Sequence, residues 1–437
     1  MATSRRVFLT SAVIAGMLPS IAACSNGTNS SPGATPPAGA TPSGNVTVWN
    51  YGDITDFTKK LNTAFTTKYP DAKVDIVAQP GDQYFALLQA AVTSGRGPDV
   101  FTMFPGGYQT QFQPFSLDLG KYIPKAEFEA VQARLFAEGS NLDNPVYGVP
   151  LLSNMYYMLY NQDIFNKAGV AAFPTTWTEL YDASEKIKKA GYLPLGYGNE
   201  SGSGGFGAFQ DFSYMSGPIE GLAGWDKLIE GAGKYDSPEL QAQVQKWADL
   251  HAKGYTNPDV LTWRGVRTDF IAGKYAMYMT GSWDAEWASQ GLGAAVHAAP
   301  APFSDNPMNV LIRLQDSGLS VNAKSKNDAT AAAYVAFAIS EEGQKIVAES
   351  GGVPSRTGVD TTNPINKEIL ANAAAKKWNV MPMFDNFIDA SVTQALVASL
   401  DQAMAGQLTA SQALSKIDSA TAAVPDAQRI KYNLAGK

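Results

Sequence analysis

Apolar positions along the chain follow two periodicities in turn, which predicts strands and helices in regular succession. Residues 46–48 alternate with period two, apolar positions in residues 57–65 recur at helical spacing, and residues 74–76 alternate again. A second helical pattern covers residues 84–92, and residues 99–103 predict a third strand after the breaker at residues 95–98. This βαβαβ order predicts a mostly parallel sheet with helices on both faces.

The same succession starts again at an aromatic strand over residues 155–160. Thr176 with Glu179 three positions later predicts one helix start, and Ser237-Pro238 predicts another. A further strand is predicted over residues 275–279. The chain is therefore expected to form two α/β units.

Ligands of open α/β sheets bind at the carboxyl ends of the strands. We therefore expect the site in the loops that follow the predicted strands, which are residues 50–53, 104–108, 198–206 and 281–284.

The N-terminal segment has the features of a cleaved export signal. Arg5 and Arg6 precede an apolar run over residues 7–18, which is shorter than the roughly 20 residues that a membrane span needs. Residues 21–24 resemble the bacterial lipobox, which implies that Cys24 is lipidated; an ordinary signal peptide with a chance cysteine is the alternative. Residues 4–9 resemble the twin-arginine motif, and the export route stays open.

Residues 25–44 contain only Ser, Asn, Gly, Thr, Pro and Ala, so they have nothing to bury and predict a flexible tether. We assign residues 1–23 to the signal peptide and residues 24–44 to the lipidated cysteine and tether. The later sequence holds no apolar run of about 18 residues, so the lipid would be the only membrane contact.

Composition narrows the classes of function. Charged residues are 17% of the chain and the net charge is −7, without a basic run, which argues against nucleic-acid binding. One cysteine and two histidines exclude a disulfide framework and a multi-cysteine zinc site. We expect neither a cofactor nor a metal.

Several motifs occur together and in order. They lie at residues 97–100, 147–150, 159–180, 270–283 and 340–354. In this combination the chain resembles the family-1 extracellular solute-binding proteins that serve ATP-driven sugar importers.

The resemblance implies a two-lobe, periplasmic-binding-protein-like (type II) α/β fold. Each lobe would be a mostly parallel sheet flanked by helices, and several strands would form the hinge between them. The implied N-terminal lobe is residues 45–151 and 303–352, and the implied C-terminal lobe is residues 152–302 and 353–437. The chain would cross between the lobes near residues 151–153, 299–303 and 351–355.

The resemblance also implies a function. The protein would be a monomer held by its lipid at the outer face of the cell membrane, capturing a carbohydrate between its lobes for the permease subunits of an ABC importer. It would not be an enzyme. The alternatives are a lipid-anchored glycoside hydrolase, which would need two carboxylates at the sugar bond, and the same binding role for a non-sugar polyol or a phosphorylated ligand.

Candidate ligand residues combine aromatic rings, which stack on sugar C–H faces, with polar groups that bond hydroxyls. Trp283 is the first choice for stacking and Asp53 for a hydroxyl-binding carboxylate. Residues 202–207 satisfy G-x-G-x-x-G, but their late position favours a glycine-rich loop that a ligand approaches over a dinucleotide site. The complete candidate set is Tyr51, Asp53, Gln83, Phe104, Asn154, Gly205, Phe206, Trp283, Asp284, Gln315, Asp316, Arg356 and Asp385.

Overall fold

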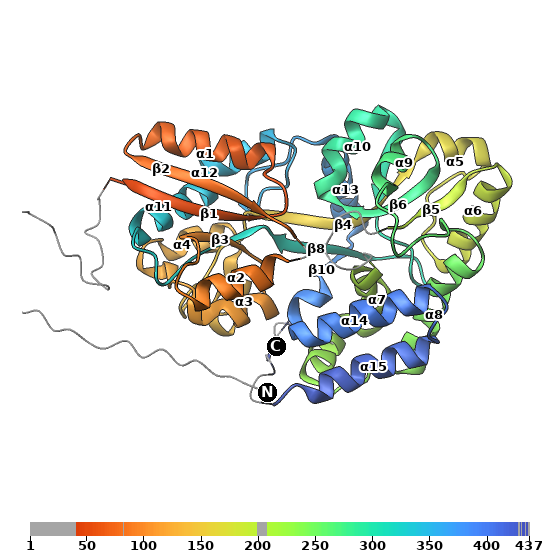
Figure 1. Cartoon of the computed structure of the whole chain (residues 1–437). Helices are drawn as coiled ribbons and strands as arrows, with labels where there is room; N and C mark the ends of the chain where they lie inside the picture. Colours follow the sequence, from red (N-terminus) through yellow and green to blue (C-terminus); the bar gives the residue numbers. More distant parts are fainter. Residues whose placement is uncertain are drawn as a thin grey trace, which may run out of the picture. The chain divides into compact units, whose positions relative to one another are not determined.

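Two β-sheets organise the described part of the chain (Figure 1). The computed structural model describes residues 41–81, 83–198, 208–426, 429, 431–432 and 434–435. None of the helices within these ranges has both the length and the apolar character required to cross a membrane.

The first sheet has the strand order β2-β1-β3-β9. Its strands are β1 (Gly44–Tyr51), β2 (Ala72–Gln79), β3 (Val100–Met103) and β9 (Gly318–Val321). Strands β2, β1 and β3 are parallel, as the sequence predicts, and β9 joins the edge of β3 in the antiparallel direction.

Helices pack on both faces of the first sheet because apolar side chains alternate along its strands. Val46 and Val48 share one core with Leu61, whereas Phe101 shares another with Leu88. Figure 1 accordingly shows α1 and α12 on one side of the sheet and α2 and α3 on the other. The helices of this lobe are α1 (Asp56–Lys68), α2 (Tyr84–Thr93), α3 (Gly107–Phe112), α4 (Lys125–Ala130), α11 (Asp328–Ile339) and α12 (Glu341–Glu349), with short 3-10 turns η1 (Gln113–Phe115), η2 (Leu119–Lys121), η3 (Ala133–Phe136) and η4 (Glu138–Ser140).

The second sheet runs β10-β8-β4-β6-β5, with β7 also paired to β4. Its strands are β4 (Leu152–Asn161), β5 (Leu193–Gly196), β6 (Tyr275–Gly281), β7 (Val296–Ala299), β8 (Val310–Asp316) and β10 (Asn379–Met381). All three partners of β4 are antiparallel to it. The prediction of a mostly parallel sheet is therefore wrong for this lobe, because a period-two pattern reports burial and not strand direction.

The second sheet is covered by helices whose starts the sequence indicates well. Thr176 caps α6 by accepting from the Glu179 backbone N–H, and Ser237 caps α8 in the same way. The helices of this lobe are α5 (Gln162–Ala168), α6 (Trp177–Lys189), α7 (Ala208–Glu230), α8 (Pro238–Ala252), α9 (Val266–Ile271), α10 (Ala285–Leu292), α13 (Pro364–Lys376), α14 (Ala390–Met404) and α15 (Ala410–Ala423), with 3-10 turns η5 (Ser282–Asp284), η6 (Gly293–Ala295) and η7 (Phe384–Phe387).

The chain passes from one sheet to the other at residues 149–152 and again at residues 316–318. Val149 bridges to Leu319 in the first sheet, and three residues later β4 begins in the second. Strand β8 ends at Asp316 in the second sheet, and β9 begins two residues later in the first. The crossing expected at residues 299–303 is thus found at residues 316–318, and β8 does not fit the N-terminal lobe predicted to include residues 303–352. The other predicted lobe boundaries stay predictions.

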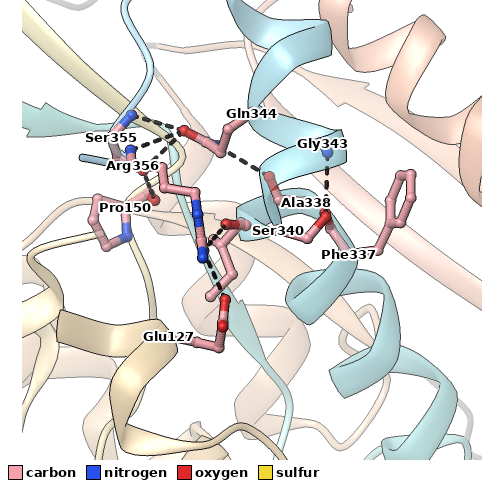
Figure 2. Close-up of polar contacts among 10 residues, drawn as sticks. Glu127, Pro150, Phe337, Ala338, Ser340, Gly343, Gln344, Ser355 and Arg356 are labelled. Atoms are coloured by element: carbon pink, nitrogen blue, oxygen red, sulfur yellow. Dashed lines mark hydrogen bonds and ion pairs between the residues drawn. The ribbon is translucent and has the colours of Figure 1, made fainter. Parts of the chain in front are cut away.

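A buried glutamine joins the first crossing to the segment after α12, and Figure 2 shows its contacts with Ala338, Ser355 and Arg356. Gln344 is fully buried, and its Nε2 donates to the carbonyl oxygens of Leu151 and Ala338 at 3.1 and 3.0 Å. Its Oε1 accepts from the backbone N–H groups of Ser355 and Arg356 at 2.8 and 3.2 Å. One side chain therefore satisfies backbone groups from three segments that meet beside the crossing.

Replacing Gln344 by Ala should lower the free energy of unfolding by about 3 kcal/mol, because buried backbone groups lose their partners. The control is Gln245→Ala, since Gln245 donates to Asp249 on an exposed face of α8. Urea denaturation of both variants measures the difference. Equal, small losses would contradict the structural role given to Gln344.

Candidate ligand-binding site

A cavity of about 1190 Å3 lies where strands of both sheets end. Five aromatic residues line it from the first lobe and five from the second. They are Tyr51, Phe57, Phe85, Phe104 and Tyr108, and Tyr156, Tyr197, Phe209, Tyr278 and Trp283, respectively. Its volume slightly exceeds the roughly 300–1,000 Å3 usual for small-molecule sites.

The first wall is a cluster of rings held against each other. Tyr51 is the last residue of β1 and Phe104 follows β3, so parallel strands bring the two side chains together, with ring centroids 5.1 Å apart. Phe85 of α2 stacks on Tyr108 of α3 at 3.9 Å. Mutual ring contacts fix this wall before any ligand binds.

The second wall presents a partly exposed tryptophan. Trp283 follows β6, is 41% exposed and stacks on Tyr156 of β4, with centroids 6.2 Å apart and planes at 24°. A Cβ on Gly281 would lie 2.4 Å from the Trp283 ring, so only glycine lets the indole lie against the strand. Because of its exposure, Trp283 is a surface aromatic of the cavity and not a core residue.

A polar network lies between the walls, next to the two crossings. Asn154 Nδ2 donates to Asp316 Oδ2 at 2.8 Å, and Asn154 Oδ1 accepts from Ser282 Oγ at 2.7 Å. Ser282 Oγ in turn accepts from the Met155 N–H at 3.0 Å. The amide of Asn154 is thereby oriented, with its oxygen and nitrogen atoms assigned by their partners.

Two carboxyl groups of the cavity are poorly solvated. Burial raises the pKa of Asp316, against the opposing effect of its hydrogen bond from Asn154. Burial also raises the pKa of Asp385 to about 7, and the charge of Asp316 acts in the same direction. A ligand with hydrogen-bond donors would therefore supply the hydrogen bonds that water does not provide to these carboxyl groups.

Six of the predicted residues line the cavity, and five lie outside its lining. The six are Tyr51, Phe104, Asn154, Trp283, Asp316 and Asp385, and the five are Asp53, Gln83, Asp284, Gln315 and Arg356. Gly205, Phe206 and Cys24 fall outside the described residues. A contact with ligand stays a prediction for every residue of the set.

Asp284 is used within the second lobe and does not support the predicted role. It is 2% exposed, and its Oδ2 accepts from Tyr278 and Thr280 hydroxyls at 3.0 and 2.6 Å. Its Oδ1 forms an ion pair with Arg267 at 2.6 Å. The Asp284 carboxylate thus holds three side chains that line the cavity, those of Tyr278, Thr280 and Arg267.

The other four residues outside the lining also have other surroundings. Arg356 donates to Glu127 of the first lobe at 2.7 Å (Figure 2). It also donates to the Ile339 carbonyl at 3.0 Å. Gln315 donates to the backbone carbonyl of Gln132. Asp53 is exposed in the loop after β1, and Gln83 is exposed directly before α2.

Sequence reasoning missed much of the second wall. Tyr156 could have been found, because it lies on the strand predicted over residues 155–160, two positions after the candidate Asn154, and therefore faces the same side. Helix α14 contributes Ala390, Thr393, Gln394, Val397, Ala398 and Asp401 to the lining. Their helical spacing does not differ from that of an ordinary amphipathic helix, so no signal was available there.

The described side chains do not form a metal centre. Within the ranges given above, no group of three or more His, Cys, Asp or Glu residues could hold a metal ion.

Known proteins similar to this chain were identified by sequence and by fold. The sequence is 26% identical over 159 residues to the arabinooligosaccharide-binding protein of Bacillus subtilis, covering 35% of this chain and 36% of the relative. It is 27% identical over 197 residues to the sn-glycerol-3-phosphate-binding periplasmic protein of Brucella abortus, covering 44% and 40%. The fold is similar to that of a chitin oligosaccharide binding protein, with a TM-score of 0.72, 20% identity and coverage of 87% and 98%.

The partial sequence matches, the fold match and the family match support different conclusions about this chain. The chain spans about half the length of the curated relatives it matches, at most 57% for the first of them, and the structural neighbour at 20% identity supports the two-lobe type II fold. The family model for bacterial extracellular solute-binding proteins matches residues 51–345, which is most of the folded chain. The chain therefore belongs to the bacterial extracellular solute-binding protein family.

Proposed function

We propose that the protein binds a neutral carbohydrate of more than one ring in the cavity and delivers it to the permease of an ABC importer. The observation that supports this most is the pairing of two aromatic walls with a polar network between them. Sugar rings present C–H faces to aromatic rings and hydroxyls to amides and carboxylates. Members of the family are binding proteins, so the hydrolase alternative is not retained.

The polar network suits sugar hydroxyls. Asp316 and Asp385 are carboxyl groups that burial has deprived of water, and each can accept a hydroxyl hydrogen. Trp283 supplies the exposed ring face beside them. A cavity of about 1190 Å3 leaves room for several rings, which favours an oligosaccharide.

The charges of the lining argue against a phosphorylated ligand. The described lining has five acidic residues, Asp56, Glu286, Asp316, Asp385 and Asp401, and one basic residue, Arg267. The Arg267 guanidinium already pairs with Asp284. Because like charges repel most strongly in a poorly solvated cavity, a neutral ligand like that of the arabinooligosaccharide-binding relative is favoured over one like sn-glycerol-3-phosphate.

A calorimetric screen tests the proposal. We expect neutral di- to tetrasaccharides to include a ligand, and sugar phosphates and glycerol phosphate to bind at least tenfold more weakly. A phosphorylated ligand that binds more tightly than every neutral sugar would contradict the charge argument. Failure of all sugars to bind would contradict the proposed function itself.

Replacing Trp283 by Ala should weaken sugar binding by about 2–4 kcal/mol, or roughly 30- to 1,000-fold, because the apolar platform is lost. The free energy of unfolding should fall by only about 1 kcal/mol, since the ring is already 41% exposed. Calorimetry and thermal melting measure the two effects.

Trp263→Ala is the matched control, because Trp263 is 36% exposed but does not line the cavity. Near-normal affinity in Trp283→Ala, or an equal loss of affinity in Trp263→Ala, would mean that the ligand lies elsewhere.

We also propose lipid anchoring through Cys24, which rests on the lipobox resemblance and the following tether. A diacylglycerol-modified cysteine holds two acyl chains, which is enough for stable attachment. The sequence predicts a flexible tether over residues 25–44, although Gly44 already begins β1. A coil of about 20 residues would have an average reach of roughly 25 Å, so the folded part would stay close to the membrane surface.

Cys24→Ala should abolish lipidation, so that the protein leaves the membrane fraction or accumulates as an unprocessed precursor. Fractionation with metabolic lipid labelling measures this. A variant that is still labelled and still fractionates with membranes would refute the lipoprotein assignment, whereas Ser25→Ala should leave both properties unchanged.

A further inference from the structure

A buried carboxylate lies behind the second wall of the cavity. Asp211 of α7 is completely buried and does not line the cavity. Its Oδ1 accepts from the Tyr156 hydroxyl at 2.7 Å, and its Oδ2 accepts from the Tyr197 hydroxyl and from Trp247 Nε1, each at 2.9 Å. Strand β4, the segment after β5 and helix α8 are thereby tied to one side chain.

Two of these three donors belong to the cavity wall. Tyr156 and Tyr197 both line the cavity, and their hydroxyls point away from it toward Asp211. Tyr156 also stacks with two further rings, those of Tyr214 and Trp283, with centroid distances of 6.1 and 6.2 Å. The orientation of Tyr156 therefore sets the support on which Trp283 lies.

This arrangement is costly for folding. The three donors are uncharged, so the carboxylate is buried without a cation among them, which is unfavourable by comparison with an apolar residue of similar size. Burial raises the pKa of Asp211 to about 7 from its ordinary 3.8, although the hydrogen bonds from Tyr156, Trp247 and Tyr197 act in the opposite direction. Packing alone does not call for a carboxylate at this place.

We propose that Asp211 is a positioning residue of the ligand site, which acts through Tyr156 and Tyr197 and touches no ligand itself. The inference rests on the proposed function of the cavity. An ionised carboxylate accepts all three hydrogen bonds, whereas a protonated one directs an O–H group at a neighbouring donor. The ionised form therefore holds the two rings best.

Ionisation of Asp211 should lower the stability of the fold but raise the affinity for ligand. The pKa of Asp211 is higher in the folded state than in the unfolded state, so its contribution to stability is lost as the pH rises through about 7. Ligand affinity should instead increase over the same range, because ionisation orders Tyr156 and Tyr197. The groups that face Asp211 stay uncharged there, since burial raises the pKa of both tyrosines well above 10 and Trp247 does not titrate.

Asp211→Asn tests the inference, because an amide cannot accept from three donors without presenting its own N–H group to one of them. At about pH 8 the variant should bind the sugar identified in the screen about 10-fold more weakly than the wild type. The part of the pH dependence of affinity that comes from Asp211 should disappear, whereas that from Asp385 should stay. Asp236→Asn is the control, since Asp236 accepts from Gln241 and Ser411 in the same lobe without lining the cavity.

Tyr156→Phe and Tyr197→Phe keep both rings and remove only their bonds to Asp211, so they test the inference even if Asp211→Asn does not fold. Each should weaken binding about 3- to 10-fold. In a double-mutant cycle the losses from Asp211→Asn and Tyr156→Phe should not add. Unchanged affinity in all three variants, or additive losses, would overturn the positioning role.

Fluorine NMR of fluorotryptophan-labelled protein provides a measurement without ligand. The Trp283 resonance, assigned with Trp283→Phe, should shift or broaden in Asp211→Asn and Tyr156→Phe and stay unchanged in Asp236→Asn. A Trp283 resonance that none of these substitutions affects would overturn the inference. Failure of the proposed function would appear separately, as a wild-type protein with no sugar ligand.

Discussion

Strand β4 is the element on which the rest of the site depends. It pairs with β6 along one edge and with β8 and then β7 along the other, and nine of its ten residues are buried. It begins directly after the crossing from the first lobe, and its Asn154 and Tyr156 side chains line the cavity. One strand therefore joins the hinge, the polar network and the aromatic wall. A change in the conformation of one of them should therefore shift the positions of the other two.

The carboxyl groups around β4 give the physical basis of the proposed ligand binding. Asp316, Asp385 and Asp211 all have pKa values raised chiefly by burial. Such groups reduce stability unless donors satisfy them, and Asp211 obtains its donors from the protein. Asp316 and Asp385 face the cavity instead, where the hydroxyls of a sugar can supply them. The unfavourable solvation of the free protein thus favours binding of a ligand rich in donors.

Much of this could be predicted from the sequence, and the exceptions have physical causes. Tyr51, Phe104 and Trp283 were found because strand ends in α/β sheets gather at ligand sites. The crossing at residues 316–318 was missed, since apolar alternation in β8 and β9 is the same whichever sheet receives the strand. The ion pair of Asp284 with Arg267 was not foreseen, because Arg267 lies on a separate element, α9. Asp211 lacked any signal, since its role depends on three donors from separate segments.

Hydrogen–deuterium exchange with and without saturating oligosaccharide tests most directly whether both walls hold one ligand. We expect slower exchange at residues 104–112, which include Phe104 and Tyr108, and at residues 278–286, which include Trp283. Exchange in α15, which does not line the cavity, should stay the same. Protection confined to one of the two walls, or located outside both while calorimetry reports binding, would contradict this expectation.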